Sequence, residues 1–265
     1  MVSIHILGSA QDGGIPHLGC DCFNCMQNHR LVASLGIDSG SHRLVIDATP
    51  DIQHQIRSFG GLSQINAIFL THLHIGHYTG LLQLGKEVAS TTKFPVYMTA
   101  TLAEFIQSNK PFSYLVDRDQ ISIRLIIPGE PITFDSCTIT AFEVPHRNED
   151  GNTVGYMITN TQNNKNCIYI PDIDFLDKAT VQKIQMADLV ILDGSFFSND
   201  ELPHFSQVPH PPILSTIKQF SPQSLSSFYF THFNHSNPIL HDIKKQEELQ
   251  NQGFNLVHDG QIIDL

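Results

Sequence analysis

Three histidines within six residues carry the clearest chemical signal in the sequence. They lie in the segment THLHIGH, residues 71–77, which directly follows the apolar run 67–70 and precedes a segment with helical spacing. Neutral imidazole is a common ligand of zinc and iron. A loop that leaves a strand can turn His72 and His74 to one side while His77 faces a neighbouring point. The motif therefore predicts a metal site where a strand ends.

Other residues of ligand type stand at the ends of other apolar runs. The histidines and aspartates in such positions are His146, Asp172, Asp193 and His232. A site built on one rim of a sheet needs side chains of this kind just past several strands. We therefore expect these residues to gather around the histidine segment.

Three of the five cysteines form a second cluster of metal-binding type. Cys20, Cys22 and Cys25 stand in a Cys-x-Cys-x2-Cys pattern. This spacing is too tight for a disulfide framework but suits thiolates around one metal ion. Cys137 and Cys167 lie in apolar runs, where we expect buried small hydrophobic side chains.

Strands and helices that could position these residues alternate along the chain. Short apolar and β-branched runs predict strands, and helical spacing marks longer segments between some of them. The predicted strands are 3–7, 43–47, 67–70, 95–98, 121–126, 138–144, 154–159, 167–170, 189–193 and 228–231, and the predicted helices are 78–88, 102–107, 175–185, 213–220 and 239–250. This order predicts one domain over residues 1–265, an α/β fold in which two sheets pack face to face with helices outside, a four-layer α/β/β/α sandwich.

Net charge and hydropathy limit the classes of partner that we expect the protein to bind. With 26 acidic and 15 basic residues, the chain has a formal net charge of −11, which disfavours nucleic acid and favours a small-molecule or peptide-derived substrate. No run approaches the roughly 20 apolar residues of a membrane span, and the first residues lack the pattern of a secretory signal. We expect a cytoplasmic protein without membrane contact.

Together these motifs resemble the metallo-β-lactamase superfamily. The residues that carry the resemblance, in chain order, are Asp47, the segment 72–77, His146, Asp172 and His232. Within the superfamily the chain is similar to the pyrroloquinoline quinone biosynthesis protein B family. The matching segments are 7–10, 13–14 with Pro16, the three cysteines, 50–52, 79–82, 193–194, 232–234 and 237–240.

The resemblance implies roles for these residues. Six side chains would bind two metal ions, His72, His74 and His146 the first, and His77, Asp172 and His232 the second. Asp47 would be a buried carboxylate that supports the histidine loop and fixes the orientation and tautomer of its rings.

At Gly76 the chain departs from the superfamily pattern, which has an aspartate there that binds the second metal ion and helps to hold the attacking water. Glycine can do neither. The second site would then keep only three ligands, and we expect it to be weaker or filled only when substrate is present. The biosynthetic family usually keeps this aspartate and replaces the first two histidines, so the chain is an atypical member.

A fourth ligand for the cysteine cluster also follows from resemblance. His235 lies three residues after His232, and this pairing with the cysteine pattern is similar to the phosphodiesterase of the carbon–phosphorus lyase pathway. Three thiolates and one imidazole complete a closed tetrahedral site, which is typical of structural zinc. We expect one structural zinc ion on the three cysteines and His235, with His17 and Asp21 as weaker alternatives.

Taken together, the ligands favour a metal-dependent hydrolase with one or two zinc ions in its active site. Zinc lowers the pKa of its bound water to about 7, and the resulting hydroxide would attack a small-molecule ester, amide or phosphoester. Asp172 would orient the water, and His232 or His210 would stabilise negative charge on the attacked oxygen. His210 lies in the Pro-rich loop 203–212, where a position at the pocket mouth and a loop histidine without a role are equally compatible with the sequence.

Three other functions stay open at this point. Histidine ligands also hold Fe²⁺ or Mn²⁺, and the similar family is associated with hydroxylation of a tyrosine in a peptide precursor, which gives an iron-dependent oxygenase in pyrroloquinoline quinone-type cofactor biosynthesis. The cysteine cluster suggests a phosphodiesterase for a small cyclic phosphate. Glycine at position 76 favours a non-catalytic binding scaffold.

Overall fold

Two seven-stranded sheets form the centre of the protein, whose computed structural model describes residues 2–147, 151–202, 209–220 and 227–265. The first sheet contains, in spatial order, β14 (Ile262–Asp264), β1 (Ser3–Gly8), β2 (Ser34–Asp38), β3 (Arg43–Ile46), β4 (Ile65–Phe69), β5 (Phe94–Met98) and β6 (Ile121–Leu125). The second contains β13 (Phe254–Leu256), β12 (Phe228–Thr231), β11 (Leu189–Asp193), β10 (Asn166–Ile170), β9 (Val154–Asn160), β8 (Cys137–Glu143) and β7 (Pro131–Phe134).

Because of the strand directions, the loops that follow many of the strands leave each sheet at the same edge. Strands β3 to β6 are mutually parallel, and so are β10 to β13. Strand β1 runs in the direction of β3, because each is antiparallel to β2, and β8 runs in the direction of β10 for the same reason with β9. Residues that follow these strands therefore emerge at the carboxyl edges of the sheets, where α/β proteins commonly bind ligands.

Alternation of side chains along the strands explains the layers. In β4, Phe69 packs in the core between the sheets, whereas Ile68 packs in a second core on the outer face of the first sheet. Phe69 meets Tyr156 of β9 with ring centroids 5.8 Å apart. Successive side chains of a strand point to opposite faces, so one strand supplies both cores.

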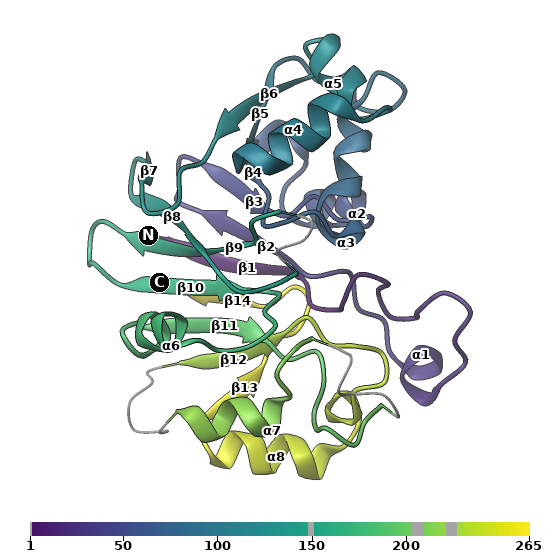
Figure 1. Cartoon of the computed structure of the whole chain (residues 1–265), viewed down its shortest axis with the longest axis vertical. Coiled ribbons are helices and arrows are strands. Elements are labelled where there is room, and N and C mark those ends of the chain that lie inside the picture. The colour runs from purple at the N-terminus through teal and green to yellow at the C-terminus, as the bar shows by residue number, and fades with distance from the viewer. Residues whose placement is uncertain (1, 148–150, 203–208, 221–226) are drawn as a thin grey trace.

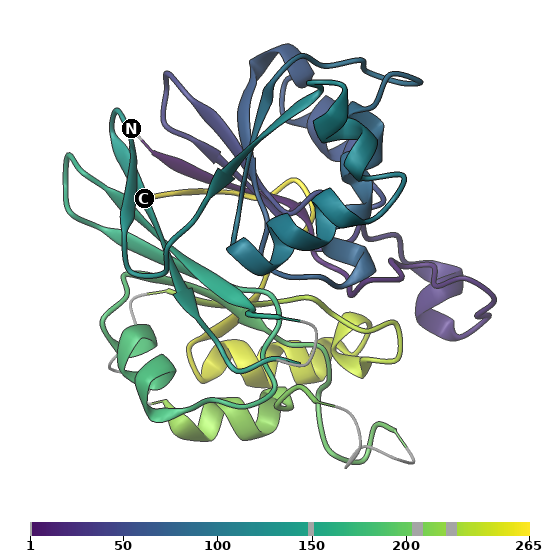
Figure 2. The same ribbon diagram turned by 45° about the horizontal axis from the view of Figure 1, so that its top comes forward.

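Helices cover the outer faces of both sheets. Helices α2 (Ile52–Ser58), α4 (Ala100–Ser108) and α5 (Ser113–Asp117) pack on the first sheet, and α6 (Lys178–Gln185), α7 (Ile213–Thr216) and α8 (Ile243–Asn251) pack on the second (Figures 1 and 2). The short α3 (Ile75–Tyr78) belongs to the histidine segment, and α1 (Phe23–Gln27) lies on a protruding loop (Figure 1). The predicted four-layer α/β/β/α sandwich is confirmed. None of the helices described combines the length and apolar character needed to cross a membrane.

The helix predicted over 78–88 is wrong in its bounds and type. Helix α3 ends at Tyr78, a 3₁₀ helix follows over Thr79–Leu84, and Gly85 ends it. The segment lies so close to residue 49 that a Cβ at Gly80 would stand 2.1 Å from the Thr49 carbonyl oxygen. This contact requires glycine, whose low helix propensity weakens a regular helix.

Several short elements gave no clear sequence pattern. The sequence analysis did not predict strands β2, β7, β13 and β14 or helices α1, α2 and α5. The other four predicted helices are present within a few residues of their predicted bounds, and two of them are partly 3₁₀ helices. Of the Pro-rich loop 203–212, residues 203–208 lie outside the described part of the chain.

Candidate metal centres

The side chains that follow the strands meet in one buried cluster around Asp172. This residue follows β10, and its carboxylate contacts Nε2 of four imidazoles: His77 at 3.0 Å, His232 at 3.2 Å, His72 at 3.5 Å and His146 at 3.7 Å. Its side chain is 2% exposed. Burial alone would raise the pKa of Asp172, but the imidazoles of His232, His72 and His77 hold it well below the usual value.

Each of these four rings has its other nitrogen engaged by a hydrogen-bond acceptor. The Nδ1 partners are Thr71 Oγ1 at 2.9 Å for His72, Asp47 Oδ2 at 2.7 Å for His77, Asp174 Oδ1 at 2.7 Å for His146 and Ser195 Oγ at 3.0 Å for His232. The two hydroxyls donate to Asp47 and Asp193, so they accept from the rings. Nδ1 therefore carries the proton, and each Nε2 turns a lone pair toward Asp172.

Lone pairs of four imidazoles facing a carboxylate repel one another unless positive charge lies between them. Five buried atoms here have no well-formed hydrogen bond within the described chain, namely Asp12 Oδ1, His72 Nε2, His77 Nε2, Asp172 Oδ2 and His232 Nε2. Two ligands about 2.1 Å from a tetrahedral ion lie about 3.4 Å apart, which is close to the separations between the Asp172 carboxylate and the four imidazoles. The donor set therefore fits divalent cations.

His74 completes a first group of ligand atoms. Its Nδ1 lies 3.2 Å from His146 Nε2, and one ligand atom each of His72, His74, His146 and Asp172 lie within 4.8 Å of one another. The structure thus brings together the three histidines that the resemblance assigned to a first metal ion, with Asp172 beside them.

A second group contains a residue that the sequence analysis missed. Ligand atoms of Asp12, His77 and His232 lie within 4.8 Å of one another, and Asp12 Oδ1 is 3.2 Å from His77 Nε2. Asp12 is therefore a ligand-type residue on this side in addition to the three that the resemblance assigned to the second metal ion. Asp12 stands in the loop after β1, and its contact with His77 depends on tertiary packing that a strand-end pattern does not show.

Asp47 supports the histidine loop as the resemblance implied. The carboxylate is fully buried and accepts hydrogen bonds from Thr71 N at 2.8 Å, from Thr71 Oγ1 at 2.9 Å and from His77 Nδ1 at 2.7 Å. Burial raises the pKa of Asp47, although the neighbouring His77 opposes this shift. Around His77, burial lowers the pKa, but Asp47, Asp12 and Asp172 raise it well above the usual value, so this position attracts positive charge.

His210 lies inside the cluster and not on an exposed loop. It is 6% exposed, its Nδ1 donates to Asp193 Oδ2 at 2.6 Å, and the same atom lies 3.8 Å from Asp172 Oδ1. Burial alone would lower its pKa, but the Asp193 carboxylate and that of Asp172 raise the pKa of His210 to about 9. Its φ of 120° is rare outside glycine, and such strained residues concentrate at functional sites.

A polar cavity of about 250 Å³ opens beside the cluster. Its lining includes Gln11, Asp12, His74, Arg147, Asp172 and His210. The volume suits a small molecule or one side chain of a peptide, so solvent and substrate can reach both groups of ligands.

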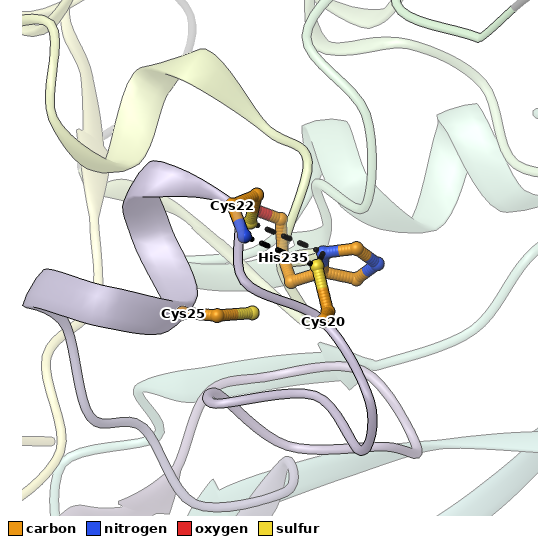
Figure 3. A group of neighbouring side chains, drawn as sticks. All are labelled: Cys20, Cys22, Cys25 and His235. Atoms are coloured by element: carbon orange, nitrogen blue, oxygen red, sulfur yellow. Dashed lines mark hydrogen bonds between the residues drawn. The ribbon is translucent and has the colours of Figure 1, made fainter.

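The cysteine cluster forms a separate site on the loop that carries α1. His235 Nδ1 lies 3.3 Å from Cys20 Sγ and 3.5 Å from Cys22 Sγ, and the Cys25 sulfur points toward the same point (Figure 3). Asn24 Nδ2 donates to the His235 carbonyl at 2.9 Å, which ties α1 to this segment. Of the candidate fourth ligands, His235 is the one that joins the three thiols in the described structure.

His17 and Asp21, the weaker alternatives, lie outside that group. The His17 ring packs beside the His235 ring at 4.6 Å between centroids, and its backbone N–H donates to Cys25 Sγ at 3.2 Å. Three sulfurs and one imidazole nitrogen match the ligand set of structural zinc sites.

Comparisons with known proteins agree with this fold. The family described as beta-lactamase superfamily domain matches residues 42–233. Coenzyme PQQ synthesis protein B of Cupriavidus necator is 26% identical over 310 residues, covering 100% of each chain. Among solved structures, Zn(2+)-bound PqqB from Methylobacterium extorquens has a TM-score of 0.86 at 24% identity over 99% of this chain and 100% of that one. A diphosphatase from the PhnP family has a TM-score of 0.78 at 23% identity, over 99% and 96%. The chain therefore belongs to the metallo-β-lactamase superfamily and is similar over its whole length to coenzyme PQQ synthesis protein B.

Proposed function

We propose that the chain is a metal-dependent hydrolase acting on a small-molecule or peptide-derived ester, amide or phosphoester. The observation that carries the proposal is the set of imidazole Nε2 lone pairs that converge on the Asp172 carboxylate. His72, His74 and His146 would hold one cation and His77 and His232 another, with Asp172 between them. When bound, such cations supply Lewis acidity and lower the pKa of coordinated water to about 7.

Asp172 and His210 are placed to handle the proton and the developing charge. Asp172 lies between both histidine groups, where its carboxylate can orient water for attack. His210 donates from Nδ1 to the Asp193 carboxylate, which raises its pKa, and it lines the cavity. It can stabilise negative charge on the attacked oxygen or donate a proton to a leaving group, and such contributions are worth about 10²- to 10³-fold in rate.

His232 suits this second role less well than His210. Its Nε2 faces Asp172 and its Nδ1 is engaged by Ser195, so both ring nitrogens are already in use. We therefore assign His232 to cation binding and His210 to charge stabilisation.

Hydrolysis can be tested on zinc-loaded protein with bis(p-nitrophenyl) phosphate and p-nitrophenyl acetate. We expect His74→Ala to lose both an active-site metal equivalent and at least about 100-fold in activity. The exposed His54→Gln on α2 is a matched control that should retain both. Full activity and metal content in His74→Ala would overturn the proposal.

A second candidate is an iron-dependent oxygenase of cofactor biosynthesis. The full-length similarity to proteins named for PQQ synthesis favours it. Substrate-dependent oxygen uptake by iron-loaded protein, with no turnover of the ester substrates by the zinc-loaded form, would select this function over hydrolysis.

A further inference from the structure

Asp12 occupies an unusual position in the second ligand group. Its carboxylate comes from the loop after β1, and Oδ1 lies 3.2 Å from His77 Nε2. The side chain is 33% exposed, yet Oδ1 itself is buried and without a well-formed hydrogen bond in the described chain. One oxygen thus points into the cluster, while the residue also lines the cavity.

The Asp12 carboxylate occupies the space into which a side chain at position 76 would project. A Cβ built on Gly76 would lie 2.2 Å from Asp12 Oδ1, 2.8 Å from Asp12 Cα and 2.9 Å from Asp12 Cγ. Real Cβ atoms do not approach other heavy atoms so closely, so a side chain at 76 and the carboxylate of Asp12 exclude each other.

We infer that Asp12 is the carboxylate ligand of the cation held by His77 and His232, in the place of the side chain that Gly76 lacks. Two further observations point to a cation here. His77 Nε2 and His232 Nε2 are buried and without partners of good geometry, and both face this point. The 3.2 Å between Asp12 Oδ1 and His77 Nε2 suits two ligands of one tetrahedral ion.

This inference rests on the metal centre of the proposed function, but not on which bond is cleaved. It changes the expectation for the second site, which gains a charged ligand from a distant loop and need not wait for substrate. When Asp12 is removed, the ring of His77 keeps Asp47 and Asp172 as partners, so variants should fold.

The test is zinc binding to the full chain, measured by competition with a chromophoric chelator and by elemental analysis. We expect three zinc equivalents in the wild type, and for Asp12→Ala a loss of affinity of about 100-fold or more at one of them. Gly76→Ala should also impair this site, because the new Cβ meets both the carboxylate and the Cα of Asp12. The exposed Asp117→Asn on α5 should match the wild type.

The outcomes separate the two proposals. Unchanged zinc affinity in Asp12→Ala would overturn the role of Asp12 and leave the hydrolase intact. Wild-type zinc affinity in Gly76→Ala, with unfolding curves like the wild type, would overturn the exclusion between Asp12 and a side chain at position 76. Wild-type protein that binds zinc only at the cysteine cluster would overturn both proposals.

Discussion

Replacement of Asp47 by asparagine should move the proton of the His77 ring from Nδ1 to Nε2 and weaken the metal site that contains His77. In the wild type, Asp47 Oδ1 accepts from Thr71 N at 2.8 Å and Oδ2 accepts from His77 Nδ1 at 2.7 Å. An asparagine can keep the bond from Thr71 only by turning its NH₂ group toward His77. Two donors cannot face each other at this distance, so His77 must move its proton to Nε2.

A proton on Nε2 removes the lone pair that faces Asp12 and Asp172. Loss of such an orienting partner lowers metal affinity about 10- to 100-fold, which corresponds to about 1.4 to 2.7 kcal/mol. Because the site is fully buried, water cannot take the place of the lost acceptor, and we expect the upper end of this range.

Asp174→Asn is a matched control at the other histidine group. Asp174 accepts from His146 Nδ1 at the same 2.7 Å, but its side chain is 26% exposed. Solvent can therefore satisfy the amide while its oxygen still serves His146, and we expect an effect below about 10-fold. Competition titrations of zinc with both variants provide the measurement, with urea unfolding of the metal-free proteins to check the fold. Wild-type affinity at every site in Asp47→Asn would refute the reasoning.

Three further predictions concern other parts of the molecule. Cys22→Ser should lose one zinc equivalent by elemental analysis and unfold at lower urea, while ester hydrolysis stays within a few-fold of the wild type; loss of the active-site ions as well would contradict two separate sites. His210→Gln should keep its metal content and lose about 10²- to 10³-fold in kcat, and a lost zinc equivalent would show that His210 is a ligand instead. Asp177 caps α6 by accepting from Thr180 N at 2.7 Å, so Asp177→Ala should cost about 0.5 to 2 kcal/mol at pH 7 in urea unfolding, and Asp177→Asn, which keeps the acceptor but not the charge, should cost less. The hydrogen bonds from Thr180 lower the pKa of Asp177, so its charged form stabilises the fold above about pH 3.9. The deficit of Asp177→Ala should shrink as pH falls through the folded-state pKa, and a constant deficit would argue against the charge.

The layered fold could be predicted because its long strands have strong local patterns. The run before the histidine segment alternates between two cores, and its successive side chains Ile68 and Phe69 pack on opposite faces. Short edge strands such as β13 and β14 have three residues each, which is too few for a period to be recognised.

The candidate site was predicted only in part, because a local pattern indicates which residues can bind but not which residues meet. Ligand types at strand ends pointed to His72, His146 and Asp172, which do lie together. Asp12 was missed because its significance depends on contact with Gly76, far along the chain. Burial of His210 against Asp193 likewise depends on tertiary packing, and the loop sequence alone gave two equal interpretations.

The central claim is that two cations flank Asp172 while a third sits on the cysteine cluster. Diffraction data from zinc-loaded crystals, recorded on both sides of the zinc absorption edge, would locate these ions directly. We expect three anomalous peaks, one among Cys20, Cys22, Cys25 and His235 and two on either side of the Asp172 carboxylate, the second of them in contact with Asp12. A single peak at the cysteine cluster, with none beside Asp172, would contradict the account.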